Sequence, residues 1–299
     1  MQIIANRKIF YIFSGILVSA SLISLLTFGL HFGIDFTGGS LLEAEYRGVR
    51  PDSEVIRRNL ESLNLGTIVI QQTGSQGLIL RFRDVDENTH QEIVALLKKT
   101  ATGFSEKRFD AIGPTIGKEL KRKSIYAIIV VLVLIVLYIA WAFRKVSKPI
   151  SSWKYGVVAV IALFHDVLIP AGLFSVLGRF AGAEVDTLFV TALLTILGFS
   201  VHDTIVVFDR VRENLRNTTG RGVDFSAIVE QSVKETIIRS INTSFTVLLS
   251  LLAIFLFGGE SIRYFTLTLI VGVIIGTYSS IFIASPFLVT WQLFGSKQK

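Results

Sequence analysis

The sequence predicts a polytopic α-helical membrane protein with six transmembrane helices and a small α+β domain outside the membrane. Hydrophobic residues make up 51% of the 299 residues, and only 18% are charged, below the roughly 25% typical of soluble domains. Six apolar windows approach the length of about 20 residues that crosses a bilayer. A hydrophilic stretch of about ninety residues separates the first two windows.

The apolar windows define six spans, at residues 9–30, 124–143, 155–178, 187–208, 240–257 and 265–288. The first apolar run is longer than the 7–15 residues of a signal peptide core, so we interpret it as a retained anchor. The predicted domains are a cytoplasmic N-terminus with the first span (1–30), an extracytoplasmic domain (31–123), the other five spans with an amphipathic cytoplasmic loop at 209–239 (124–290), and a cytoplasmic tail (291–299).

The basic residues near the spans predict the orientation. Cytoplasmic loops of membrane proteins carry an excess of lysine and arginine. One side of the predicted topology holds fourteen: Arg7, Lys8, Arg144, Lys145, Lys148, Lys154, Arg210, Arg212, Arg216, Arg221, Lys234, Arg239, Lys297 and Lys299. The short loops on the other side hold only Arg179 and Arg263. Both termini are therefore expected in the cytoplasm. The distribution of the basic residues is more informative here than the net charge of +7, and we expect no nucleic-acid partner.

The extracytoplasmic domain is predicted to be ferredoxin-like. Strand and helix patterns follow the order β-α-β-β-α-β, at residues 40–46, 51–63, 66–72, 77–83, 85–100 and 106–112. His90 lies on the polar face of the second helix and is expected at the surface. No reactive constellation appears in this domain, so a binding surface is the natural interpretation.

Two further helical patterns concern packing. Apolar residues recur at helical spacing across 225–237, after Asp224 as a possible N-cap. This segment is predicted either to lie on the membrane surface or to pack against its own bundle. In the sixth span Gly272, Gly276 and Ser280 form part of a small-residue stripe with a period of four, which lets another helix approach closely. The partner helix is either internal or from another protein.

Two aspartates lie inside the apolar windows. Asp166 is near the middle of span three, and Asp203 is five residues before the end of span four; each follows a histidine, His165 or His202. A charged group at membrane depth costs about 2.5–3.5 kcal/mol on insertion scales and rarely persists without a partner or a task. A functional role is therefore predicted for both aspartates.

Arg239 opens span five at the membrane side where Asp203 lies. A low-dielectric site disfavours an ionised carboxyl, a nearby cation favours it, and arginine stays charged throughout. Protonation of Asp203 would release Arg239, and deprotonation would recapture it. Proton passage would then become helix movement. The alternative is a static ion pair that fixes the helix register.

A metal site built from the two His–Asp pairs is a third interpretation, because imidazole and carboxylate both bind metals. Spans three and four are antiparallel and place the pairs at different depths, which argues against convergence. The chain contains no cysteine, so a cysteine metal site is excluded. We therefore expect no metal, no other cofactor and no enzymatic chemistry.

Several motifs together resemble the SecF branch of the SecD/SecF family. They are GIDFTGGSLLE at 33–43, with Gly33, Asp35, Gly38 and Gly39, HDV at 165–167, HDTIVVFDRVREN at 202–214 and RSINTS at 239–244. The six-span layout with one outer domain also matches, so the resemblance covers nearly the whole chain. One departure is His202, where family members often have asparagine.

The resemblance implies half of an RND-type transporter, completed by SecD, in the bacterial inner membrane. It implies that the proton motive force assists protein translocation, with Asp203 as the proton carrier, Arg239 as its switching partner, and Asp166 and His202 as further relay groups. H⁺ and Na⁺ both stay open as the coupling ion. The implied partners are SecD, the SecY-SecE-SecG channel, YajC, the translocating polypeptide and membrane lipid.

Two other functions compete with this interpretation. One is half of an RND-type exporter of small molecules or lipids, but the single small outer domain differs from the large paired domains of such pumps. The other is a scaffold that stabilises the Sec complex without acting as a motor. A scaffold would tolerate the loss of the Asp203 charge.

Overall fold

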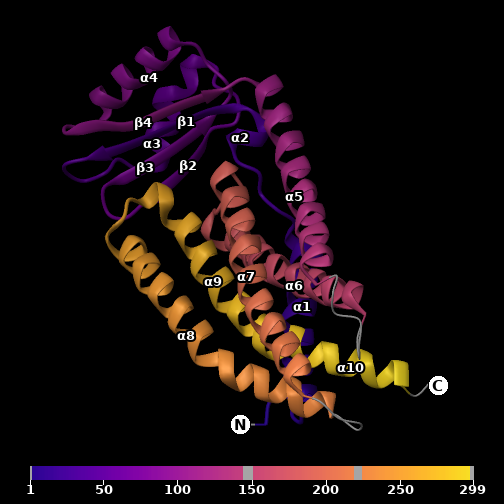
Figure 1. Cartoon of the computed structure of the whole chain (residues 1–299). Coiled ribbons are helices and arrows are strands. Elements are labelled where there is room, and N and C mark those ends of the chain that lie inside the picture. Colours follow the sequence, from indigo (N-terminus) through magenta and orange to yellow (C-terminus); the bar gives the residue numbers. More distant parts are fainter. Residues whose placement is uncertain (1, 144–150, 219–223, 297–299) are drawn as a thin grey trace. The chain divides into compact units, whose positions relative to one another are not determined.

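The computed structural model describes residues 2–143, 151–218 and 224–296, which form two compact units (Figure 1). The helical unit comprises the described parts of Met1–Leu30, Ala127–Ala183 and Leu188–Lys299, and the sheet unit comprises His31–Tyr126 and Glu184–Thr187. Some of the basic residues and part of the tail used in the predicted topology lie outside the described residues: Arg144, Lys145, Lys148, Arg221, Lys297 and Lys299.

Six helical segments of the described chain are long and apolar enough to cross a membrane. They are α1 (Arg7–Phe28), α5 (Pro114–Ala142), α6 (Ser152–Ala181), α7 (Thr187–Asn217), α8 (Phe225–Phe257) and the run formed by α9 (Arg263–Ser279), the π-helical turn η3 (Ser280–Ala284) and α10 (Ser285–Ser296). A short 3-10 turn, η2 (Glu260–Ile262), precedes α9. The number of spans agrees with the sequence prediction.

The segment at 209–239, predicted as an amphipathic cytoplasmic loop with helical spacing across 225–237, is mostly helical among its described residues. Helix α7 continues through the charged segment to Asn217, and α8 joins the amphipathic segment and span five in one helix. The sequence from 187 to 217 has a single glycine, Gly198, and no proline, and 225–257 has neither. Charge density marks where a helix meets water, but it does not end the helix.

The sheet unit contains four antiparallel strands in the order β2-β3-β1-β4. The strands are β1 (Gly39–Tyr46), β2 (Val69–Thr73), β3 (Gly77–Phe82) and β4 (Phe104–Ile112); the helices are α2 (Ile34–Thr37), α3 (Ser53–Leu60) and α4 (Glu87–Thr100), with a 3-10 turn η1 (Glu61–Leu63). Asp52 and Asp86 cap α3 and α4 by accepting hydrogen bonds from backbone N–H groups. Alternate residues of β1 and β3 face the two helices and form the core with them: Leu42, Tyr46, Leu78, Leu80, Ile56, Leu60, Ile93 and Leu97.

His90 is buried, so its predicted surface position is wrong. Its ring stacks on Phe109, with centroids 3.7 Å apart. Nδ1 lies 3.2 Å from Glu87, and Nε2 lies 3.1 Å from Glu106. Glu87 lies on the same helix as His90, whereas Glu106 lies on β4, and the sequence alone does not show that β4 meets this face of α4.

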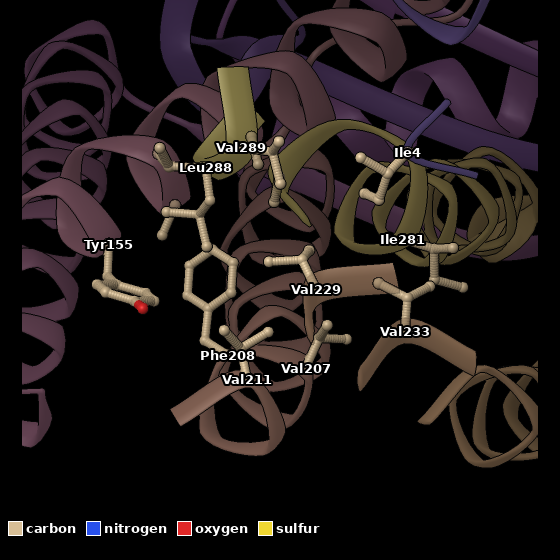
Figure 2. Packing of buried hydrophobic residues seen from close by; sticks show 14 of the residues in the cluster. Ile4, Tyr155, Val207, Phe208, Val211, Val229, Val233, Ile281, Leu288 and Val289 are labelled. Atoms are coloured by element: carbon tan, nitrogen blue, oxygen red, sulfur yellow. The ribbon is translucent and has the colours of Figure 1, made fainter. Parts of the chain in front are cut away.

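The amphipathic segment of α8 packs against its own bundle (Figure 2). Phe225, Val229 and Val233 join one buried apolar cluster with Phe208 and Leu288. The membrane-surface alternative therefore does not describe this conformation. Ile3 and Ile4 belong to the same cluster, and their backbone N–H groups donate to the Glu230 carboxylate at 3.1 and 2.7 Å.

Glycines set two close helix contacts in the helical unit. A Cβ atom on Gly272 would overlap Ile196, and one on Gly276 would lie 3.0 Å from Ser200 Cβ, so the partner of the stripe in α9 is α7. A second contact joins α6 to α1, where a Cβ on Gly172 would lie 2.5 Å from Ser21 Cα. The contact at Gly172 was not predicted from the sequence.

The GIDFTGG signature shapes the start of the sheet unit. Gly38 and Gly39 have φ values of 77° and 130°, which favour glycine. Gly33 has φ −73° and is extended, and its N–H donates to Val185 O at 2.9 Å. Asp35 Oδ2 accepts hydrogen bonds from Thr187 N at 2.8 Å and Thr187 Oγ1 at 2.5 Å. The signature therefore binds the segment that leads into α7.

The same segment places Glu184 beside Arg81, with Oε2 and Nε 2.8 Å apart. Burial raises the pKa of Glu184 above its usual 4.5, although Arg81 opposes this shift, and Asp186 and Asp35 add to it. Desolvation of the carboxylate therefore outweighs its attraction to Arg81.

Glu184→Gln is expected to change the pH dependence of stability. An acid with a raised folded-state pKa contributes stability below its unfolded value, and that contribution is lost as pH rises through the folded value. The wild-type chain should thus lose stability relative to Glu184→Gln as pH rises from 4 to 7. Thermal unfolding of both proteins across this range measures the difference. A widening advantage of the wild type at pH 7 would contradict it.

Candidate functional site

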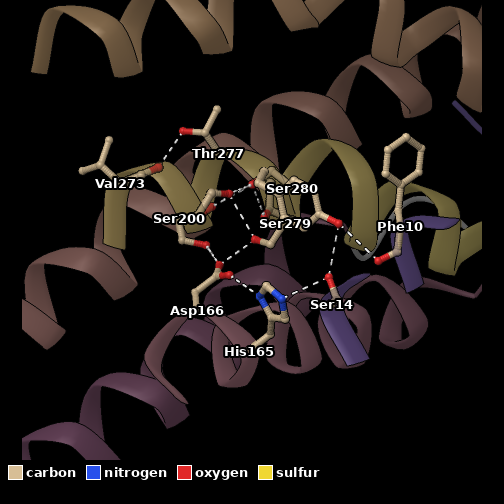
Figure 3. Close-up of polar contacts among 12 residues, drawn as sticks. Phe10, Ser14, His165, Asp166, Ser200, Val273, Thr277, Ser279 and Ser280 are labelled. Atoms are coloured by element: carbon tan, nitrogen blue, oxygen red, sulfur yellow. Dashed lines mark hydrogen bonds and ion pairs between the residues drawn. The ribbon is translucent and has the colours of Figure 1, made fainter. Parts of the chain in front are cut away.

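Asp166 lies at the centre of a buried polar cluster in the helical unit (Figure 3). Its side chain, on α6, is fully buried. Oδ2 accepts a hydrogen bond from Ser200 on α7 at 2.5 Å and one from Ser279 on α9 at 2.6 Å. Oδ1 lies 2.8 Å from Nδ1 of His165. Three helices therefore converge on one carboxyl group.

The cluster extends from His165 to α1. Nε2 of His165 lies 3.2 Å from Ser14 Oγ, and Ser14 donates to the Tyr278 hydroxyl at 3.3 Å. Tyr278 in turn donates to the Phe10 carbonyl at 3.1 Å. A further link joins Ser280 to Thr204, with their hydroxyl oxygens 3.0 Å apart. Thr204 directly follows Asp203, so the polar contacts reach the turn of α7 that carries the second aspartate.

Asp203 is buried and has an unusual environment. Its Oδ2 atom is inaccessible to solvent and has no hydrogen-bond partner within the described residues. Ser240, Thr277, His202 and Arg239 are close enough to act on the carboxyl electrostatically or through their hydroxyls. A buried carboxylate oxygen without a donor is costly when ionised. This arrangement suits a group that takes up a proton.

The predicted direct pair between Asp203 and Arg239 is not formed in this conformation. The Arg239 side chain is exposed, and among the described residues no ion pair joins it to Asp203. Ser240, the next residue, is buried, and its hydroxyl lacks a partner. Residues 236, 240 and 244 lie on the buried face of α8, and Arg239 lies outside this face.

The two histidines that precede the aspartates differ in burial. His202 is exposed on α7, and His165 is buried and bonded to Asp166. The two His–Asp pairs therefore do not converge, and no cluster of three or more histidine, aspartate or glutamate side chains suited to a metal occurs in the described residues. Ser14, Ser200 and Ser279 were not predicted as site residues. Serine is common in membrane helices because its hydroxyl can bond the backbone of the preceding turn, so only the fold distinguishes these three.

Comparison with known proteins agrees with the motifs. The family model described as protein export membrane protein SecD/SecF, C-terminal, matches residues 92–293, and that of the SecD/SecF GG motif matches residues 23–47. The protein translocase subunit SecF of Thermobaculum terrenum is 42% identical over 305 residues, covering 98% of this chain and 94% of the relative. SecF of Anaerolinea thermophila is 41% identical, with the same coverage.

Solved structures agree as well. The crystal structure of SecDF from Thermus thermophilus, a translocon-associated membrane protein, matches with a TM-score of 0.84 and 31% identity over 97% of this chain. A super-membrane-facing form of SecDF matches with a TM-score of 0.69 and 30% identity. The chain spans 38% and 39% of those SecDF chains. The family models, the relatives and the fold agree, and the chain belongs to the SecD/SecF family of protein-export membrane proteins, within its SecF branch.

Proposed function

We propose that this chain uses the movement of a coupling ion through its helical unit to assist protein translocation, and that this ion is H⁺. The observation that carries the proposal is the buried Asp203 carboxyl with its unpartnered oxygen. An ionisable group inside membrane helices marks an ion pathway by default. Neutralisation by a proton removes the cost of burying the charge. Repeated uptake and release would then alter the packing of α7.

The proposed partners follow from the solved relatives and the exposed surface. The chain matches part of SecDF proteins, so SecD would complete an RND-type unit, with the SecY-SecE-SecG channel, YajC and the translocating polypeptide as further partners. Large apolar side chains are exposed along α1, α5 and α8, including Ile16, Leu134, Tyr138, Phe245 and Leu252. Such faces fit lipid or partner helices. No covalent chemistry is proposed, so the chain would act as a motor subunit and not as an enzyme.

The proposed setting is the bacterial inner membrane with both termini in the cytoplasm, supported by the lysine and arginine distribution. We also infer that the sheet unit is ferredoxin-like. Its β-α-β-β-α-β order and antiparallel strand order β2-β3-β1-β4 support this class.

Export into inverted vesicles tests the proposed function. Vesicles with SecD and this chain, or with SecD alone, receive a presecretory protein with and without an ion gradient. The chain is expected to increase export only when a gradient is present. Proton and sodium gradients applied separately identify the coupling ion. An equal increase without any gradient would contradict the motor role and favour a scaffold.

A further inference from the structure

The directions of the hydrogen bonds around His165 and Asp166 determine how many protons this pair carries (Figure 3). The Phe10 carbonyl can only accept, so Tyr278 donates its single hydroxyl proton there. The Tyr278 oxygen then accepts from Ser14. Ser14 has one proton and has already donated it, so its contact with His165 requires Nε2 to be the donor. Nε2 of His165 therefore carries a proton.

The other ring nitrogen faces a carboxyl oxygen. Nδ1 lies 2.8 Å from Oδ1 of Asp166. Two bare acceptors at this distance would repel each other, so one proton lies between them. It belongs either to an imidazolium beside a carboxylate or to a carboxylic acid beside a neutral imidazole. Both arrangements leave the pair without net charge.

The surroundings favour this neutral, proton-loaded state. The groups that face the pair are the hydroxyls of Ser14 on α1, Ser200 on α7, and Ser279 and Tyr278 on α9. Within the described chain no lysine or arginine forms an ion pair with Asp166. Removal of the shared proton would leave one negative charge on a fully buried carboxyl, which is strongly unfavourable.

We propose that His165 and Asp166 form a second proton-binding site of the transport pathway, which holds one proton shared between Nδ1 and the carboxyl group. The proposal rests on the proposed function for its role in transport, but not for its proton count. Ser14 Oγ accepts the hydrogen bond from the second ring nitrogen, Nε2. Ser200 links the carboxyl to α7, three residues before Asp203. A change in the number of protons on the pair therefore alters a hydrogen bond to α7, the helix that carries Asp203.

Histidine-selective ¹⁵N NMR of the full chain with SecD in lipid bilayers tests the proton count. The chain has four histidines, and His165→Gln identifies the signal by its loss. Nε2 of His165 is expected to be protonated between pH 6 and 8, and Nδ1 to share a proton. Asp166→Asn should remove the shared proton and leave Nε2 protonated. Ser14→Ala, a milder change, should shift Nε2 alone. An unprotonated Nε2 in the wild type, or an Nδ1 signal unchanged in Asp166→Asn, would overturn the proposal.

Export in the vesicle assay tests the role in transport. His165→Gln and Asp166→Asn are expected to lose most of the gradient-dependent export, whereas His31→Gln, at an exposed histidine, should retain it. A shared proton combined with full gradient-dependent export in His165→Gln would overturn the role in the pathway. The two proposals fail separately. If Nε2 of His165 carries no proton, the proposal of a second proton-binding site is wrong, even when the gradient still drives export. If export does not depend on the gradient, the proposed motor function is wrong, even when the pair holds the shared proton.

Discussion

Asp203→Asn is expected to abolish the gradient-dependent part of export while the protein remains folded. Asparagine has nearly the same shape but cannot take up and release a proton. The substitution breaks no hydrogen bond of Oδ2, because that atom has none within the described residues, and it removes the cost of a buried charge. Export in the inverted vesicles, with and without the gradient, measures the effect.

Asp209→Asn is the matched control for this result. Asp209 lies on the same helix, but it is exposed and contacts Arg212 at 3.3 Å. Surface changes of this kind alter stability by about 0.5 kcal/mol or less, so export should stay at the wild-type level. Co-purification with SecD reports assembly of both variants. If Asp203→Asn assembles and still responds to the gradient, the carboxyl has a structural role and the scaffold function is favoured.

Gly172→Ala is expected to destabilise the helical unit strongly. The new methyl group would lie within 2.5 Å of the Ser21 backbone, and backbone cannot move aside as a flexible side chain can. Two hydrogen bonds also hold this contact: Ser24 Oγ donates to Gly172 O at 3.0 Å, and Ser175 Oγ donates to Ser24 O at 2.9 Å. Separating α1 from α6 would weaken both. Overpacking costs about 1–3 kcal/mol or more, which should lower the melting temperature in detergent by several degrees.

Gly15→Ala provides the control for the glycine substitution. Gly15 lies on α1, and no atom lies within 4 Å of a Cβ placed there. Alanine favours helix over glycine by about 1 kcal/mol, so the melting temperature should hold or rise slightly. Equal destabilisation by Gly15→Ala and Gly172→Ala would show that the close contact at Ser21 does not set the stability.

The sequence predicts the spans well because apolar runs of about 20 residues are directly visible in the hydropathy. It also predicts the order of strands and helices in the sheet unit, because apolar residues recur every 2 residues in a strand and every 3.6 residues in a helix. It predicts helix ends poorly. The predicted span ends at residue 208, but helix α7 continues through the charged residues to Asn217 because no residue there breaks a helix.

The site was predicted only in part for a related reason. Asp166 and Asp203 can be identified from the sequence because each is a charged residue within an apolar span, and this pattern is visible in a single span. Apart from His165, the partners of Asp166 come from two other helices, α7 and α9, and their spacing in sequence does not show that they meet. His165 and His202 have the same neighbour in sequence, yet one is buried and the other exposed. Only the rotation of each helix about its axis, set by packing, distinguishes them.

Helix α8 runs without interruption for 33 residues, about 50 Å of helical rise at 1.5 Å per residue, and it bends along its length (Figure 1). It contains no glycine or proline, the usual sites of sharp bending. Arg239 and Ser240 lie near the middle of this continuous helix. We therefore expect a rearrangement near Asp203 to be transmitted along the backbone hydrogen bonds of α8 to both of its halves, the amphipathic segment and the apolar span.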